Sequence, residues 1–368
     1  MKIGIDVRLW SESGIGRYTR NLVLNLLEID KKNEYVLFVK RSDKEEIEKY
    51  IKNNKRWETT EFNLRWHSFS EQLSFPKAIN KENVDLMHFP YFSVPIFYKG
   101  AFVVTIHDLI YHHFISGEAS TLPLWLYGFK MLAYRITINN AVRKAKKVIA
   151  VSQFTKEDII DNLIVDKRKI EVVYEGADDF KTSEGRVEYK NYFLFVGNVY
   201  PHKNAEKLIK AFEIFSKEND FQLIFVGKDD HFYKKLKNKT KSLEKNKKLF
   251  YEFNVDDKKL GGLYKNSIGL IRPSLMEGFS LPPIEALMEN TIPVVSDIPT
   301  HKEILKDGAV YFNPQDIYDI VSKMKFVAQL TNQKRNELIS KGKENISSFS
   351  WKKTAQETLK IYESSLGL

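Results

Sequence analysis

Short runs of β-branched and aromatic residues alternate with longer amphipathic stretches along the whole 368-residue chain. In the first half, the short runs predict strands at 1–7, 35–39, 85–89, 102–108, 147–152 and 169–176. The stretches between them, such as 16–29 and 154–162, have apolar residues at helical spacing. Strands and helices in alternation predict a parallel sheet covered by helices on both faces.

A polar segment at 178–188 interrupts this alternation, and we interpret it as an interdomain linker. A second series of strands is predicted at 192–198, 221–228, 248–254, 268–274, 291–297 and 309–313. Because 368 residues exceed what one core usually spans, we predict two α/β domains, at 1–178 and 189–350. The tail, 351–368, carries Trp351, Ala355, Leu359 and Tyr362 at helical spacing, and we predict a final helix. Packing back on the first domain is one option, but the pattern alone leaves open which domain it packs on.

Composition and charge narrow the range of partners. The chain has no cysteine, which excludes disulfides and thiolate sites and is compatible with a reducing cytosol. It shows neither a signal-peptide pattern nor an apolar run of about 18 residues. We therefore expect a cytoplasmic protein, either soluble or peripheral on the inner face of the cell membrane. The net charge of +10 suits phosphorylated small molecules or anionic lipid. The lysines are dispersed and no nucleic-acid module is evident, so we expect no nucleic-acid partner.

The segment 273–289 contains the pattern most suggestive of chemistry. Pro282 and Pro283 suit a helix start, and a loop that leads into a helix directs backbone N–H groups at an anion. Glu277 and Glu285 lie eight positions apart, and carboxylates accept hydrogen bonds from the vicinal hydroxyls of a sugar or a ribose. The alternative is that Glu285 complements the helix dipole and Glu277 is solvated.

The string from Glu277 to Glu285 resembles the E-x7-E signature of GT-B glycosyltransferases of family four. Other segments typical of the family follow in order: SGIGRYTRNL, TIHDL, VSQFTKEDI, FVGNVYPHKN and IPVVSDIPTHKEILKDGAVYFNP. The resemblance covers nearly the full length. It implies a GT-B fold, in which two Rossmann-like domains, one for the acceptor and one for the nucleotide sugar, face a central cleft.

The resemblance also implies a reaction. A retaining hexosyltransferase would move a sugar from GDP-mannose or a UDP-sugar to a glycan or lipid-linked saccharide, as in cell-surface polysaccharide synthesis. The VGN-x-x-PHKN string favours mannose. The family needs no cofactor and no metal, and we find no Asp-x-Asp motif. We interpret the pairs Asp229-Asp230 and Asp256-Asp257 as helix caps or surface groups.

By the same resemblance, the catalytic residues are His107, Lys203 and Glu277. His107 ends a buried strand at the edge where α/β proteins bind ligands, with His112 and His113 as runners-up. Lys203 would neutralise the leaving diphosphate. The family usually has an arginine where this chain has Asn198. Either Lys203 then carries more of the phosphate charge, or Arg272 is a candidate replacement. Arg272 could equally be a structural ion-pair member.

The remaining candidates are predicted to bind the donor. Gly14 and Gly16 are expected in a loop, before a helix that begins near Arg17, where glycine permits positive φ and close approach to phosphate. The full donor-binding set is Gly14, Gly16, Asn198, Gly227, Lys228, Asn254, Val255, Arg272, Gly278, Phe279, Ser280, Leu281 and Glu285.

Residues 119–156 contain no acidic residue but seven basic ones. Leu122, Trp125, Leu126, Phe129, Leu132, Ala133 and Ile136 recur there at helical spacing. The segment could meet anionic lipid headgroups. We favour the other interpretation, a helix whose apolar face covers the core and whose basic face is solvated.

Three other functions share this architecture. A nicotinamide- or flavin-dependent oxidoreductase would have G-x-G-x-x-G, but Gly14-x-Gly16 is followed by Thr19. A non-catalytic sugar- or nucleotide-binding protein would not need the complete string from Glu277 to Glu285. A sugar-nucleotide epimerase remains open and would isomerise the donor without an acceptor.

Overall fold

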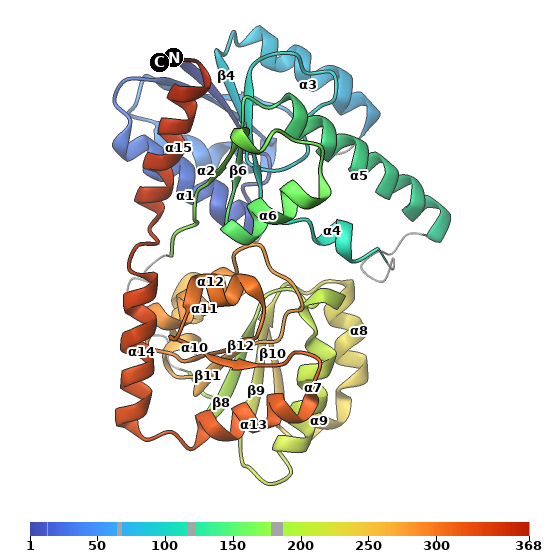
Figure 1. Ribbon diagram of the computed structural model, residues 1–368, viewed down its shortest axis with the longest axis vertical. Coiled ribbons are helices and arrows are strands. Elements are labelled where there is room, and N and C mark those ends of the chain that lie inside the picture. Colours follow the sequence, from blue (N-terminus) through green and yellow to red (C-terminus); the bar gives the residue numbers. More distant parts are fainter. Residues whose placement is uncertain (13, 65–67, 116–122, 178–186, 368) are drawn as a thin grey trace. The chain divides into compact units, whose positions relative to one another are not determined.

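The computed structural model describes residues 1–368 except 13, 65–67, 116–122, 178–186 and 368. Most of the predicted linker and the first residues of 119–156 therefore lie outside the described residues. The chain forms two compact units (Figure 1). Unit 1 comprises residues 1–176 and 349–368, and unit 2 comprises residues 177–348.

Unit 1 contains a seven-stranded, all-parallel sheet of order β3-β2-β1-β4-β5-β6-β7. Its strands are β1 (Lys2–Asp6), β2 (Glu34–Val39), β3 (Trp57–Glu61), β4 (Leu86–Phe89), β5 (Phe102–Ile106), β6 (Lys147–Ala150) and β7 (Ile170–Val172). Its helices are α1 (Gly14–Ile29), α2 (Arg41–Ile51), α3 (Phe69–Lys81), α4 (Ile110–His113), α5 (Leu124–Lys144), α6 (Gln153–Asn162), the short 3-10 helix η1 (Lys167–Lys169) and α15 (Trp351–Ser365). Residues of α3, α5 and α6 share one core with alternate strand positions, whereas α15 packs on α1.

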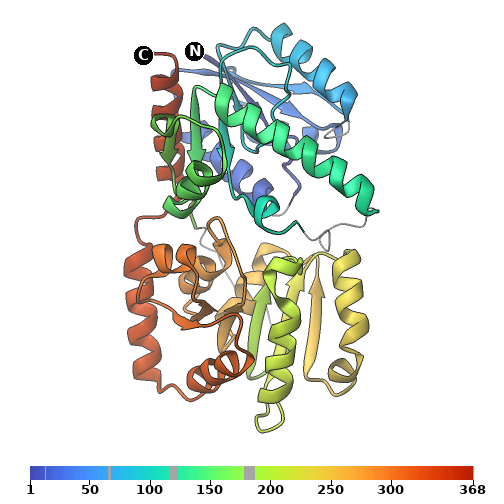
Figure 2. The ribbon, with the colours of Figure 1, turned by 45° about the vertical axis from the view of Figure 1, so that its right-hand side comes forward.

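Unit 2 contains a six-stranded parallel sheet of order β10-β9-β8-β11-β12-β13 (Figure 2). Its strands are β8 (Tyr192–Val196), β9 (Gln222–Gly227), β10 (Leu249–Phe253), β11 (Gly269–Arg272), β12 (Pro293–Ser296) and β13 (Val310–Phe312). Its helices are η2 (Pro201–Lys203), α7 (Ala205–Phe215), α8 (His231–Lys239), α9 (Lys241–Lys245), α10 (Asp257–Lys265), α11 (Leu281–Met288), α12 (Pro299–Leu305), α13 (Ile317–Ala328) and α14 (Asn332–Ile346).

The two faces of the second sheet follow the two-residue period of its strands. Phe193 and Phe195 lie in the core shared with α7 and α13, and Tyr192 and Leu194 lie in the core shared with α10 and α11. Burial on both faces explains why these strands read as continuous apolar runs.

The sequence pattern predicts every strand of unit 2 but misses β3 of unit 1. Its sequence is WETTE, too polar for a buried strand, and it pairs only with β2 at the edge of the sheet. Stacking of Trp57 on Tyr35, with ring centroids 3.9 Å apart, anchors it there.

The C-terminal helix α15 belongs to unit 1, to which it contributes a partly polar buried face. Trp351, Ala355 and Tyr362 are buried as predicted, whereas Leu359 is only half-buried. Thr354 donates from Oγ1 to the carbonyl of Tyr174 at 2.7 Å. Among the described residues, no helix combines the length and apolar character needed to span a membrane.

Both sheets reverse their direction of growth next to their first strand. The chain moves outward from β1 to β3 and returns to β4 beside β1, and it moves from β8 to β10 and returns to β11 beside β8. Connections diverge at such a point and leave room for a ligand beyond the carboxyl ends of the strands. In unit 2 this point lies between the end of β8 and Arg272.

Candidate functional site

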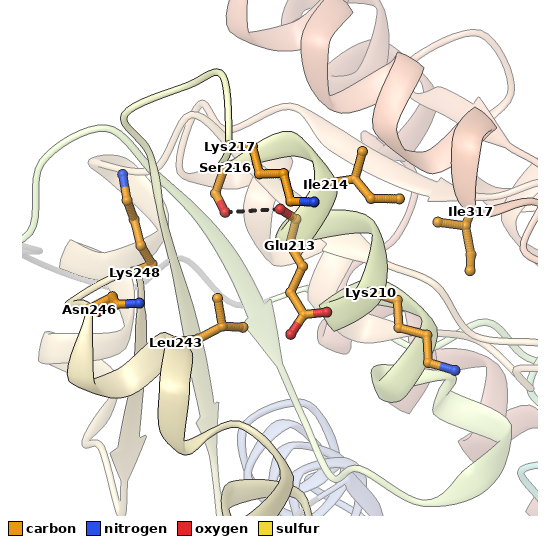
Figure 3. Close-up of a pocket in the computed structure, with 9 residues that line it drawn as sticks. All are labelled: Lys210, Glu213, Ile214, Ser216, Lys217, Leu243, Asn246, Lys248 and Ile317. Carbon is orange, nitrogen blue, oxygen red and sulfur yellow. Dashed lines mark hydrogen bonds between the residues drawn. The ribbon is translucent and has the colours of Figure 1, made fainter.

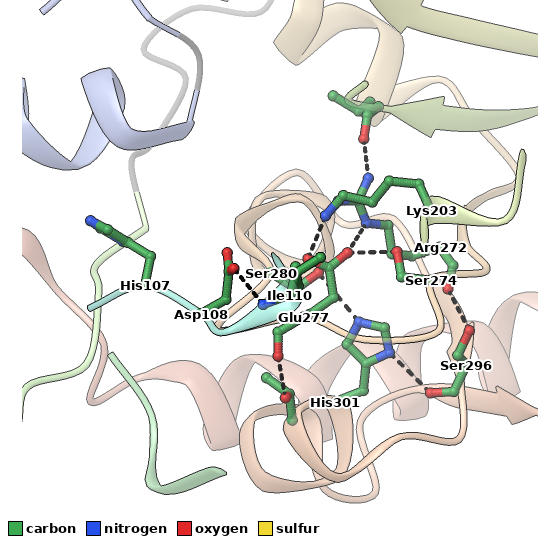
Figure 4. A network of polar contacts seen from close by, with 12 residues as sticks. His107, Asp108, Ile110, Lys203, Arg272, Ser274, Glu277, Ser280, Ser296 and His301 are labelled. Atoms are coloured by element: carbon green, nitrogen blue, oxygen red, sulfur yellow. Dashed lines mark hydrogen bonds and ion pairs between the residues drawn. The ribbon is translucent and has the colours of Figure 1, made fainter. Parts of the chain in front are cut away.

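Lys203, Arg272 and Glu277 form a buried ionic cluster at this point of unit 2 (Figure 4). Lys203 ends η2, Arg272 ends β11, and Glu277 lies in the loop before α11. The Nζ of Lys203 lies 2.7 Å from Oε2 of Glu277, and Nε of Arg272 lies 2.8 Å from Oε1. Ser274 donates to the same Oε1 at 2.5 Å. The structure therefore brings together two of the predicted catalytic residues and the predicted replacement arginine.

The cluster keeps Glu277 ionised. Burial raises the pKa of its carboxyl, but the charges of Arg272 and Lys203 outweigh burial and hold the pKa well below its usual range. The interpretation that Glu277 is simply solvated is wrong, because its side chain is buried between two cations. Two cations and one carboxylate leave one net positive charge, which suits an anionic ligand.

Arg272 lies against the turn that follows β8. Its Nη1 donates to the carbonyl of Val196 at 2.6 Å. A Cβ atom at Gly197, where φ is +132°, would lie 2.7 Å from the same Nη1. Glycine at this position thus leaves space for the guanidinium. The next residue is Asn198, whose buried Oδ1 has no hydrogen-bond partner among the described residues.

The loop into α11 is held by unusual backbone geometry and by α12. Ser280 has φ +76°, which is uncommon for a residue with a side chain. Its Oγ lies 3.3 Å from Nε2 of His301, and Thr300 donates to the carbonyl of Glu277 at 2.6 Å. Burial lowers the pKa of His301 to about 4, so this imidazole is neutral at pH 7. Gly278 and Phe279 are buried in the same loop. Leu281 begins α11, and Pro282 and Pro283 lie in its first turn as predicted.

Glu285 lies in α11 and is buried. Its Oε2 accepts a hydrogen bond from the hydroxyl of Tyr264 at 2.7 Å, and Tyr264 comes from α10. This contact fixes the carboxylate near the start of the helix.

Four residues of the predicted donor-binding set lie at the end of β9 or just after β9 and β10: Gly227, Lys228, Asn254 and Val255. Asn254 has φ +53° and donates its N–H to the carbonyl of Gly227 at 3.3 Å. A Cβ at Gly227 would meet the ring of Tyr233, so only glycine fits there. Lys228 is exposed, and Val255 is half-buried. Asp230 and Asp256 cap α8 and α10, which confirms the interpretation of the two aspartate pairs.

The prediction that Gly14 and Gly16 lie in a loop of unit 1 is wrong. Gly14 and Gly16 lie in the first turn of α1, which begins three residues earlier than expected, and neither has φ in the left-handed region. A Cβ at Gly16 would lie 2.6 Å from the carbonyl oxygens of Leu9 and Trp10. Close packing, and not positive φ, explains glycine at position 16. Gly14 is exposed with open space around its Cα.

His107 follows β5 and is held through both ring nitrogens. Its Nδ1 lies 2.9 Å from Oε1 of Glu175, and its Nε2 lies 2.9 Å from the carbonyl oxygen of Pro90. Burial opposes the charged form, but the bonds to Glu175 and Pro90 outweigh burial and raise the pKa of His107 above its ordinary value. A carboxylate and a carbonyl oxygen both accept hydrogen bonds, so this geometry favours the protonated ring over a free base.

The runner-up histidines have structural partners. Nδ1 of His112 lies 2.9 Å from the Tyr134 hydroxyl, and Nε2 of His113 lies 2.7 Å from Oδ1 of Asp158. Asp108 accepts a hydrogen bond from the backbone of Ile110 at 3.0 Å.

Several residues of these networks are missed by sequence reasoning. Ser274 stands three positions before Glu277, outside the signature string, and nothing in the sequence links the two residues. Thr300 and His301 belong to a segment that is recognised only as typical of the family. Tyr264 and Glu175 have no sequence signal, because their roles depend on packing between distant elements.

Two pockets are lined by residues other than the predicted site residues. Figure 3 shows one of them, lined mainly by residues in or next to α7, α9 and α13 of unit 2. It is lined by Lys210, Glu213, Ile214, Ser216, Lys217, Leu243, Asn246, Lys248 and Ile317. A smaller one in unit 1 is lined by Asp6, Leu9, Thr19, Phe89, Pro90 and Tyr91, beyond the ends of β1 and β4. Within the described ranges, no group of three or more His, Asp or Glu side chains is placed to hold a metal ion.

Comparison with known proteins identifies the family. Residues 13–179 match the model of Glycosyltransferase Family 4, and residues 177–345 match that of Glycosyl transferases group 1. The O-antigen chain mannosyltransferase RfbU of Salmonella typhimurium is 30% identical over 267 residues, which cover 73% of this chain and 71% of that protein. The chain belongs to the group 1 glycosyltransferases.

Two further likenesses extend the assignment. The serotype-specific mannosyltransferase WbdA of Escherichia coli is 35% identical over 176 residues, which cover 46% of this glycosyltransferase but only 20% of WbdA. The crystal structure of HepE from Anabaena in complex with UDP-glucose superposes with a TM-score of 0.75 at 14% identity, covering 99% of this chain and 100% of HepE. This likeness and the two parallel sheets establish the GT-B fold of this glycosyltransferase.

Proposed function

We propose that this glycosyltransferase moves mannose from a nucleotide-diphosphate donor to a glycan or lipid-linked saccharide during cell-surface polysaccharide synthesis. The names of RfbU and WbdA, both mannosyltransferases, support the sugar and the type of product. GDP-mannose is the first candidate donor. A UDP-sugar is the alternative, because HepE was solved with UDP-glucose.

The observation that carries the proposal is the buried cluster of Lys203, Arg272 and Glu277 with its single net positive charge. It lies beyond the carboxyl ends of β8 and β11, where open α/β sheets bind ligands. A diphosphate that entered this site would meet two cations already fixed by hydrogen bonds. The N-terminus of α11 would add backbone N–H groups.

The cluster is suited to departure of the diphosphate. As the glycosidic bond breaks, negative charge grows on the leaving oxygen, and Lys203 and Arg272 would stabilise it without reorganising. Glu277 orients both cations and, in our proposal, also accepts a hydrogen bond from the transferred sugar. Glu285 would accept a hydrogen bond from a ribose hydroxyl. We further propose attack on the same face, which retains the anomeric configuration, and no requirement for a metal or other cofactor.

In unit 1 we propose that His107 places a positive charge near the donor. We do not propose that it abstracts a proton. Its two acceptors, Glu175 and Pro90, stabilise the imidazolium.

A cytoplasmic location remains a prediction.

Thermal unfolding in the presence of GDP-mannose, UDP-glucose, GDP and UDP tests the donor. A ligand that binds only the native state raises the unfolding temperature. A ligand concentration of 100 times the Kd adds about 2.7 kcal/mol to the free energy of unfolding. We expect the largest rise with GDP-mannose. A rise with UDP-glucose alone would reassign the donor, and no rise with any of the four would overturn the proposal.

Product analysis separates the remaining functions. Incubation with GDP-mannose and a mannose-terminated acceptor, with and without EDTA, should yield an α-linked product. Its anomeric configuration, assigned by NMR, should match that of the donor. An isomerised donor without transfer would instead identify an epimerase. Binding without turnover across acceptors would identify a binding protein.

A further inference from the structure

Helix α5 of unit 1 has two apolar faces. The first covers the core: Tyr127, Met131, Tyr134 and Ile138 are buried in it with residues of the sheet. This face contains none of the residues that the sequence pattern assigned to the core. Every described member of the predicted core-facing set is exposed, so the interpretation that this set covers the core is wrong; the members are Trp125, Leu126, Phe129, Leu132, Ala133 and Ile136. Leu122 lies outside the described residues.

The second face is exposed, and we call it the α5 stripe. It consists of Trp125, Phe129, Leu132 and Ile136, whose exposed fractions are 67%, 67%, 56% and 50%. At 100° per residue these four side chains lie within an arc of about 60°. Figures 1 and 2 show the N-terminal half of α5 extending away from the strands of its unit. A contiguous exposed patch of this kind marks a surface that meets another apolar phase.

Basic residues surround the α5 stripe. Lys130 and Arg135 are exposed on either side of it, and Arg143 continues the same arc at the end of the helix. Lys130 also lies over the ring of the partly exposed Tyr111, with Nζ 5.9 Å from its centroid. No acidic residue occurs from 119 to 156, so no carboxylate of this segment neutralises the rim.

We propose that the α5 stripe inserts into the headgroup region of an anionic lipid bilayer. Aromatic and aliphatic side chains flanked by lysine and arginine match a surface that is apolar below and negatively charged above. A second copy of the chain fits less well. A two-fold contact through this face would bring the same basic rim against itself, and like charges at an interface oppose association. The proposal does not depend on the donor or on the reaction.

Flotation with vesicles tests the proposal in the absence of donor and acceptor. The full chain is mixed with vesicles of phosphatidylglycerol or of phosphatidylcholine alone. The variants are Trp125→Gln with Phe129→Gln, and Lys130→Gln with Arg135→Gln. Phe69→Gln is the matched control, because Phe69 is an equally large side chain, 75% exposed, on α3 of the same unit.

We expect binding to phosphatidylglycerol that is at least tenfold tighter than binding to phosphatidylcholine. The paired aromatic substitution should weaken it by about tenfold or more. The paired basic substitution should weaken it by about 25-fold, which is roughly fivefold for each charge. Phe69→Gln should bind like the unmodified protein. Tryptophan emission should shift to shorter wavelength on vesicle binding, and Trp125→Phe should reduce that shift.

Other results would overturn the proposal. One is equal vesicle binding by the aromatic variant and the unmodified protein, and another is no preference for anionic lipid. A concentration-dependent dimer in light scattering without vesicles, abolished by Trp125→Gln with Phe129→Gln, would assign the face to a second copy. Failure of the protein to bind any nucleotide sugar would leave the vesicle result unaffected and would count only against the proposed function.

Discussion

The ammonium group of Lys203 lies 2.7 Å from Oε2 of Glu277, although 74 positions separate the two residues in the chain. Arg272 approaches the other oxygen of the same carboxylate. Glu277 therefore compensates two buried cations in unit 2. In the proposed function it also holds them where a diphosphate would be received.

Removal of Glu277 should destabilise unit 2 strongly. Glu277→Ala leaves Lys203 and Arg272 buried without their partner, and breaking a buried pair in this way costs about 3–5 kcal/mol. Urea unfolding measures the change. Ser274→Ala is the control, since it removes one hydrogen bond to the same carboxylate and should cost about 1–3 kcal/mol. Equal stability of Glu277→Ala and the unmodified protein would show that water compensates the two cations.

Lys203 should affect turnover more than donor binding. If its contact strengthens as charge leaves, Lys203→Ala should lower kcat by about 100- to 1,000-fold with a smaller change in donor Kd. Calorimetry and steady-state kinetics separate these quantities. If kcat and donor affinity fall by the same factor, Lys203 contributes only to donor binding.

Arg272 should not be replaceable by lysine. Its guanidinium bonds Glu277 through Nε and Val196 through Nη1, a geometry that a single ammonium group cannot reproduce. Arg272→Lys should therefore weaken donor binding by about tenfold or more, measured by calorimetry, while Lys325→Arg on the surface should have no effect. Retained affinity in Arg272→Lys would contradict its role as substitute for the arginine missing at Asn198.

Glu285 should contribute to binding of the nucleoside. Glu285→Ala removes charge-assisted hydrogen bonds and should weaken nucleotide-sugar binding by roughly 1–3 kcal/mol. Tyr264→Phe keeps the carboxylate but removes the bond that orients it, so it should have the smaller effect. Unchanged affinity in a folded Glu285→Ala variant would exclude the ribose contact.

Sequence reasoning succeeded where the signal is local. Continuous apolar runs located the strands, and Pro282 and Pro283 located the start of α11. It failed at β3, where one stacked tryptophan at a sheet edge outweighs a polar sequence. It also failed at α5, because a helix that is apolar on two sides gives no periodic contrast to show which side is buried.

In the candidate site, too, local patterns could be predicted and contacts between distant residues could not. The string from Glu277 to Glu285 could be recognised, but the partners of its two carboxylates could not. Lys203, Arg272 and Tyr264 reach them from separate elements. Which nitrogen of His107 faces which acceptor likewise depends on Glu175, which is 68 positions away.

The buried histidine of unit 1 should make stability depend on pH. Nδ1 of His88 lies 2.6 Å from the Tyr362 hydroxyl on α15, and Nε2 lies 2.9 Å from Oγ1 of Thr105. Burial lowers the pKa of His88 from 6.5 to about 3. Above about pH 6.5 the ring is neutral in both the folded and the unfolded state, and its contribution to stability is complete. As the pH falls from about 6.5 towards 3, the unfolded state binds a proton that the folded state does not, so stability is lost.

His88→Gln tests this dependence through thermal unfolding at several pH values. The variant should unfold at a lower temperature than the unmodified protein at pH 7, because it disrupts both hydrogen bonds. That difference should narrow by a few degrees as the pH falls to about 5, since only the unmodified protein pays for keeping residue 88 unprotonated. His231→Gln, at an exposed position on α8, serves as the control and should show no such narrowing. A constant difference between His88→Gln and the unmodified protein across this range would show that His88 does not couple folding to pH.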